Sequence, residues 1–177
     1  MKKSKFFPLF LILALLAGLL AVPSHAAADP AVAAPHALVL DGGSGAVLFA
    51  KDADARIYPA STTKIMTALL TVEAVERGDV RADEAVTAPA EAFSDLIAEG
   101  STAGIRPGET LTVRQLLDCA MVASANEACN ILAIRLAGSI AAFAARMNER
   151  AAALGCADTH FVNTHGLPDS GHFTTPA

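Results

Sequence analysis

The stretch Pro59-Ala60-Ser61-Thr62-Thr63-Lys64-Ile65-Met66 constrains this chain more than any other part of it. An apolar run with helical spacing follows as far as Val75, so the stretch is predicted to begin a buried helix, with Pro59 just ahead of its first turn. Residues i and i+3 share a helix face, so the Ser61 hydroxyl and the Lys64 amine can touch. Ser61 is predicted in the first turn, where unpaired backbone N–H groups and the helix dipole favour developing negative charge.

This spacing supports two interpretations. A serine hydroxyl becomes a good nucleophile when a nearby base takes its proton, and a lysine can be that base when burial lowers its pKa. In the alternative, Ser61 caps a helix and Lys64 extends into water, which is the commoner meaning of an isolated S-x-x-K. The choice between them depends on the rest of the chain.

The N-terminus has the layout of a secretory signal peptide. Lys2, Lys3 and Lys5 precede an uncharged apolar run over residues 6–22, and Ser24-His25-Ala26 offers a small-residue cleavage site. We therefore expect residues 1–26 to be a signal peptide and the protein to be exported to the cell envelope or secreted. An uncleaved membrane anchor is less favoured, because the run is short for a span and Pro8 interrupts it. Residues 27–35 are rich in Ala and Pro and are predicted to be a flexible leader.

The remaining chain, residues 36–177, has about the length of one domain. After residue 28 there are ten Lys and Arg against eighteen Asp and Glu, a formal charge of −8, without a basic cluster. This composition argues against nucleic acid and an anionic membrane surface as partners, so any membrane association would depend on parts outside this chain.

Three cysteines occur, Cys119, Cys129 and Cys156, and their spacing matches neither a disulfide framework nor a metal site. We expect no metal and no cofactor. Cys119 and Cys129 are predicted to be small buried residues on helices, and whether any disulfide forms stays open.

The pattern of elements is mixed. A hairpin is predicted over residues 36–50, a short strand within 84–89, and helices over 61–77, 113–123 and 127–136, with a last helix that Ser139 caps and Gly155 terminates. Thr112 and Gln115 match a capping box at the start of the second helix. Ser124-Ala125-Asn126 lies at the corner between two helices, and residues 159–177 are predicted to be a loop.

That corner carries a second motif. Ser124 as an ordinary N-cap is the default interpretation of S-x-N on its own. A helix corner can also direct both side chains into a cleft. S-x-x-K followed some 60 residues later by S-x-N is far more specific, because the pair is typical of penicillin-binding proteins and class A β-lactamases.

Residues 36–176 resemble a low-molecular-weight penicillin-binding protein, a serine-type D-alanyl-D-alanine carboxypeptidase of the peptidase S11 family. The last matching stretch distinguishes this family from β-lactamases, and its Thr164 stands where the family usually has proline. The matching stretches are Asp41 to Gly45, Pro59 to Thr67, Pro107-Gly108-Glu109-x-Leu111-Thr112, Ser124 to Ala128, and Thr159-His160-Phe161-x-Asn163-x-His165-Gly166-Leu167-x-Asp169.

The resemblance implies an α/β (α+β) fold like that of β-lactamases and penicillin-binding-protein transpeptidases, with an antiparallel sheet flanked by helices and an all-helical part. It implies that Ser61 forms an acyl-enzyme with the penultimate D-alanine of a peptidoglycan stem peptide, releasing the terminal D-alanine. Lys64 would take the serine proton, Ser124 would relay a proton to the leaving group, and Asn126 would hold the substrate amide and Lys64. β-Lactam antibiotics are implied as covalent inhibitors at the same serine.

Two further expectations concern what surrounds these motifs. His160 and His165 are interpreted as structural residues that pack the last loop onto the helices. The family's K-T-G motif does not occur in the sequence, so we expect an N-terminal part of a catalytic domain, incomplete at the C-terminus, which would be inactive by itself.

Two alternatives remain open: a β-lactamase or esterase of the same fold, and an inactive secreted fragment. The His165-Gly166-Leu167 stretch and the lack of a recognisable deacylating glutamate motif weigh against the first.

Overall fold

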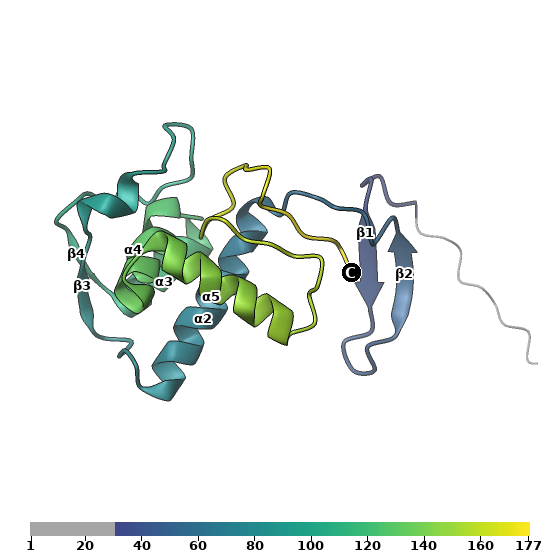
Figure 1. Ribbon diagram of the computed structural model, residues 1–177, viewed down its shortest axis with the longest axis horizontal. Helices are drawn as coiled ribbons and strands as arrows, with labels where there is room; N and C mark the ends of the chain where they lie inside the picture. Colours follow the sequence, from purple (N-terminus) through teal and green to yellow (C-terminus); the bar gives the residue numbers. More distant parts are fainter. Residues whose placement is uncertain (1–30) are drawn as a thin grey trace, which may run out of the picture. The chain divides into compact units, whose positions relative to one another are not determined.

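The core is built around one helix near the middle of the chain. The computed structural model describes residues 31–177, so the predicted signal peptide and most of the predicted leader lie outside the described residues. Helix α4 (Asn126–Ala137) has eight consecutive buried residues, from Asn126 to Ala133. Helices α2 (Thr63–Arg77), α3 (Val113–Val122) and α5 (Ile140–Ala153) each pack against it (Figure 1). A helix buried on every side requires apolar or hydrogen-bonded residues all around, which α4 supplies.

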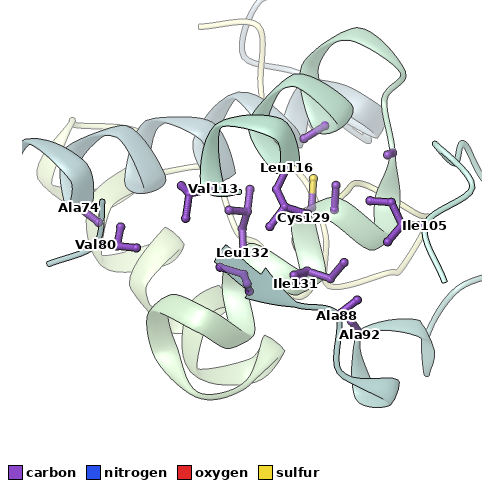
Figure 2. Packing of buried hydrophobic residues seen from close by; sticks show 14 residues of the cluster. Ala74, Val80, Ala88, Ala92, Ile105, Val113, Leu116, Cys129, Ile131 and Leu132 are labelled. Carbon is purple, nitrogen blue, oxygen red and sulfur yellow. The ribbon is translucent and has the colours of Figure 1, made fainter. Parts of the chain in front are cut away.

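The main hydrophobic cluster lies between α3 and α4. Val113 and Leu116 of α3 pack against Cys129, Ile131 and Leu132 of α4, as Figure 2 shows. Leu116 and Leu132 are fully buried, and each contributes about 1.5–3 kcal/mol by leaving water. A second cluster joins α4 to α5 through Phe143 and Met147. The first cluster reaches the end of α4 that carries Asn126 through Ala128 and Cys129, whereas the second holds the other end of α4 at Ala133.

Helix boundaries follow the local signals in the sequence. Thr112 and Gln115 form the predicted capping box at the start of α3. Ser139 caps α5 by accepting a hydrogen bond from the Ala142 N–H at 3.0 Å. Helix α2 ends at Gly78, whose φ of +79° costs a glycine no steric strain. The described residues contain no single helix that is long and apolar enough to cross a membrane; α4 and α5 reach that length only as a pair bent by 85°.

Two small antiparallel sheets accompany the helices. Strands β1 (Ala37–Leu40) and β2 (Val47–Lys51) form the predicted hairpin, with an irregularity in register between Val39 and Leu40. Strands β3 (Ala85–Thr87) and β4 (Thr110–Thr112) pair beside α3. β3 confirms the short strand expected in 84–89, whereas β4 was not predicted and ends at Thr112, the residue expected to cap the next helix.

The prediction for α2 is wrong in two respects. Ser61 lies in a short 3₁₀ turn, η1 (Ala60–Thr62), and the α-helix begins only at Thr63. The apolar run was expected to be buried, yet Ile65 is 61% exposed and the buried face is polar. That face consists of Thr63, Lys64, Thr67 and Thr71, together with Ala74. Hydroxyl groups can be buried there because each has a hydrogen-bond partner, such as the Thr164 carbonyl for Thr67 at 2.6 Å.

The final segment, residues 159–177, is a loop, as predicted, but it is well anchored. Isolated antiparallel bridges join Ile57 to Thr174 and His160 to Phe173. The short 3₁₀ turn η2 (Ala90–Phe93) begins the segment that connects β3 to β4.

Candidate active site

The predicted nucleophile is held at the start of α2 in a strained turn. Ser61 is exposed, and the residue before it, Ala60, has a φ of +49°, which is unusual for a residue with a side chain. Gly166 presses on this turn from the last loop: a Cβ at Gly166 would lie 1.8 Å from the Ala60 carbonyl oxygen. Only glycine allows two backbones to approach this closely, so the backbone of the last loop at Gly166 packs directly against the backbone of the turn that carries Ser61.

Lys64 is the buried partner of Ser61. Its residue is 2% exposed, and its Nζ donates hydrogen bonds to the Ser61 Oγ at 3.2 Å and to the His165 carbonyl at 2.8 Å. Burial lowers the pKa of Lys64, although Cys129 and Glu127 on α4 favour the charged form and oppose that shift. A lowered pKa increases the neutral fraction of the amine, which is the form that can accept a proton from Ser61.

Ser124 lies on the other side of the nucleophile. Its Oγ donates to the Ser61 Oγ at 3.0 Å across 63 residues of sequence. The default capping interpretation fails, because Ala125 is the N-cap of α4 and its side chain makes no cap hydrogen bond. Ser124 has a φ of +55°, a left-handed conformation that few residues other than glycine adopt. The strained corner therefore directs Ser124 to Ser61.

Asn126 begins α4 and lies at the edge of a pocket of about 190 Å³. Its backbone N–H donates to the Ser101 carbonyl at 2.9 Å, and a Cβ at Gly100 would lie 2.8 Å from its Nδ2. Among the described residues, the hydrogen bonds of Lys64 Nζ go to Ser61 and His165 and not to Asn126. The structure thus brings Ser61, Lys64 and Ser124 into direct contact, with Asn126 lining the neighbouring pocket.

Glu127 was not identified from the sequence, although an acidic residue directly after S-x-N is a visible signal. It is 1% exposed, and its Oε1 accepts from the Thr102 hydroxyl at 2.7 Å and the Ala103 N–H at 2.8 Å. These contacts hold the wall of the pocket formed by Gly100, Ser101 and Thr102. Glu127 thereby fixes that wall relative to α4.

The two histidines of the last loop differ from each other. His160 is exposed and stacks on Phe173, as expected for a structural residue. His165 is 2% exposed, and its carbonyl contacts the Lys64 amine. Sequence reasoning gave no reason to place His165 at the site, because the contact is made by a backbone atom.

The three cysteines are free thiols. Cys129 is buried as predicted, and burial raises its pKa to about 12, whereas Cys119 is only partly buried and Cys156 is exposed. Within residues 31–177 no cluster of three or more His, Cys, Asp or Glu side chains could hold a metal ion.

The chain is similar to known proteins in both sequence and fold. The peptidase S11 family, described as D-alanyl-D-alanine carboxypeptidase, matches residues 23–176. D-alanyl-D-alanine carboxypeptidase DacF of Bacillus subtilis is 36% identical over 142 residues, which cover 80% of this chain and 36% of that protein.

Among solved structures, penicillin-binding protein 5 of Haemophilus influenzae matches with a TM-score of 0.81 and 29% identity, covering 85% of this chain and 44% of that one. Penicillin-binding protein D2 of Listeria monocytogenes in its ampicillin-bound form matches with a TM-score of 0.69 and 31% identity, covering 81% of this chain and 57% of that one. The fold is therefore the expected β-lactamase-like one.

The chain spans between about a third and three fifths of the length of these relatives. The family match extends over nearly all of the described residues and includes each of the residues that meet at Ser61. The chain belongs to the S11 family of D-alanyl-D-alanine carboxypeptidases.

Proposed function

We propose that the protein acts as a serine-type D-alanyl-D-alanine carboxypeptidase that removes the terminal D-alanine of peptidoglycan stem peptides through an acyl-enzyme on Ser61. The observation that carries this proposal is that the Ser61 Oγ lies within hydrogen-bond distance of both the Lys64 Nζ, at 3.2 Å, and the Ser124 Oγ, at 3.0 Å. A nucleophile flanked by a base and a second proton carrier can complete both halves of an acyl transfer.

In the first half, Ser61 Oγ attacks the carbonyl carbon of the penultimate D-alanine while its proton passes to the neutral Lys64 amine. The backbone N–H of Ser61 would contribute to the site for the developing oxyanion. When the tetrahedral intermediate collapses, the C–N bond breaks and the leaving amine takes a proton from the Lys64 ammonium by way of the Ser124 hydroxyl. Terminal D-alanine departs, and the shortened peptide remains esterified to Ser61.

In the second half, water attacks the ester and releases the shortened peptide. Lys64 takes a proton from that water and returns one to the Ser61 oxygen, so the site regains its starting state. Asn126, at the edge of the pocket, is proposed to bind the substrate amide. The neighbouring pocket wall, held by Glu127, would face the same part of the substrate.

β-Lactam antibiotics are the proposed covalent inhibitors, because their reactive carbonyl would meet the same serine. The ampicillin-bound relative from Listeria monocytogenes supports this part of the proposal. Peptidoglycan lies outside the cytoplasmic membrane, so the proposal includes the extracytoplasmic location inferred from residues 1–26.

The test is covalent labelling of the complete gene product with a fluorescent penicillin, followed by peptide mass spectrometry. We expect stoichiometric labelling of Ser61 and loss of all labelling in Ser61→Ala. Ser139→Ala is a matched control, since it removes a serine that caps α5 and should leave labelling intact at a cost of about 1 kcal/mol in stability. Labelling that survives in Ser61→Ala, or a wild-type protein that is never labelled, would contradict the proposal.

A further inference from the structure

A second group of polar side chains lies behind Lys64 and includes no reacting atom. The His165 ring has a partner at each nitrogen: Nδ1 accepts from the Leu167 N–H at 3.2 Å, and Nε2 lies 3.2 Å from the Asp95 Oδ2. Because Nδ1 accepts, Nε2 must carry the hydrogen and donate to Asp95. The side chain of His165 is 1% exposed, so the ring has no room to reorient.

Asp95 is itself tied to the core. Its Oδ1 accepts from the Asn130 Nδ2 at 2.7 Å, and the same amide also donates to the Ala92 carbonyl at 2.9 Å. Asn130 is fully buried on α4, and its Oδ1 accepts from the Thr164 hydroxyl at 2.6 Å. Burial by itself would raise the pKa of Asp95, but the hydrogen bonds from the His165 ring and the Asn130 amide outweigh it and hold that pKa below its usual value.

This group meets the reacting residues at one atom. The carbonyl oxygen that accepts from Lys64 Nζ belongs to His165. The preceding carbonyl, of Thr164, is held by the Thr67 hydroxyl at 2.6 Å. The backbone at His165 is thus fixed from α2 on one side and through its own ring on the other, so a shift of the ring would move the acceptor of the Lys64 amine.

We propose that Asp95 and His165 are positioning residues for Lys64: the Asp95 carboxylate holds the His165 ring, and the ring holds the carbonyl that aims the Lys64 amine at Ser61. The inference rests on the proposed function for the reaction that it serves. It assigns a role to the segment after η2, which contributes no reacting group. Exposed ion pairs contribute little to stability. In the contact between Asp95 and His165 the histidine is almost completely buried, and its proposed effect is to fix the position of the His165 carbonyl.

The experiment follows the titration of Lys64 itself in the complete gene product. The ¹³Cε signal of Lys64 can be assigned by its loss in Lys64→Arg and then followed against pH by NMR. The variants are Asp95→Asn, His165→Ala and the double variant. Asn148→Ala is the matched control, since Asn148 also ties a helix to the last loop, through both backbone groups of Phe161 at 2.7 and 2.8 Å, away from Lys64.

Without its carbonyl acceptor the charged form of Lys64 is less favoured, so both single variants should lower its pKa, by about one unit. Glu127 and Cys129, the other groups that act on Lys64, are unchanged in every variant. His165→Ala retains the Asp95 charge, so a lowered pKa of Lys64 in this variant would distinguish positioning from a simple charge effect. The double variant should lower the pKa of Lys64 no further than either single variant does, as expected for residues that act as a unit. Penicillin labelling should slow by about 10- to 100-fold, as for a misplaced catalytic group.

Asn148→Ala should lower thermal stability and leave the Lys64 titration unchanged. The proposal is overturned if Lys64 titrates as in the wild type in Asp95→Asn or His165→Ala, or if Asn148→Ala shifts it equally. A shifted titration in a protein that penicillin never labels would support the positioning pair and contradict the proposed function, so the two can fail separately.

Discussion

Acidification should destabilise this protein through His172, a buried histidine that contacts the first residue of α2. The His172 Nε2 lies 2.8 Å from the Thr63 Oγ1, and its Nδ1 accepts from the Val162 N–H at 3.1 Å. The ring is therefore neutral with its hydrogen on Nε2. Protonation would place a second hydrogen on Nδ1, directly against the Val162 N–H donor.

The size of the effect follows from the pKa. Burial is the largest cause that lowers the pKa of His172, from 6.5 to about 4. The unfolded chain binds a proton below pH 6.5 while the folded one does not, so stability falls as pH drops from 6.5 towards 4 and levels off below it. At about 1.36 kcal/mol per unit, the difference amounts to about 3 kcal/mol at most. The residue is 1% exposed, so solvent screening should remove little of this.

The assay is urea unfolding at half-unit steps between pH 7.5 and pH 4, compared between the wild type and His172→Gln. Glutamine can offer an acceptor to Val162 and a donor to Thr63 without titrating. The unfolding free energy of the His172→Gln variant should therefore depend much less on pH in this window than that of the wild type. His160→Gln is the matched control, since His160 is exposed, and it should keep the wild-type slope. Equal slopes in the wild type and His172→Gln would refute the reasoning. Carboxylates with lowered pKa values, such as Asp95, lose their contribution only at more acidic pH.

Three further predictions concern the site. Lys64→Arg keeps the charge and removes the base, so Ser61 acylation should slow by at least ~100-fold. The acylation rate of the wild type should rise with pH up to the lowered pKa of Lys64. A near-normal acylation rate in the variant would show that Lys64 is only a structural cation. Ser124→Ala should mainly lower turnover, whereas Asn126→Ala should also weaken substrate binding, as steady-state kinetics can distinguish; identical losses that follow stability alone would favour a purely structural role for both. Gly166→Ala should abolish penicillin labelling because of the clash with the Ala60 carbonyl, whereas Gly155→Ala, with a φ of +86° but nothing within 4 Å of its Cβ, should cost only about 1 kcal/mol in a thermal melt.

Local features of the chain could be predicted where neighbouring residues alone decide them. The i, i+3 spacing of Ser61 and Lys64 survives the change from an α-helical to a 3₁₀ first turn, because both place the two side chains on one side. The capping box at Thr112 and the glycine at the end of α2 depend only on backbone groups a few residues away. Family membership could also be recognised from motifs, since each is a short local pattern.

The buried face of α2 could not be predicted in this way. Hydrophobicity favoured burial of Ile65, but the face that packs inward carries threonines, and the hydroxyls of Thr63 and Thr67 meet His172 and the Thr164 carbonyl of the last loop. Whether a hydroxyl can be buried depends on a partner about 100 residues away, and no local pattern identifies that partner.

The sequence by itself therefore identified the Ser61–Lys64 pair and the Ser124–Asn126 corner as the candidate site, because each motif is contained in a few adjacent residues. Only the tertiary structure decided that Ser124 meets Ser61 across 63 residues, that the His165 carbonyl accepts a hydrogen bond from Lys64, and that Asp95 contacts the ring of that histidine. The physical reason is that these contacts join separate elements through backbone atoms and strained turns, whose positions are set by how the helices pack.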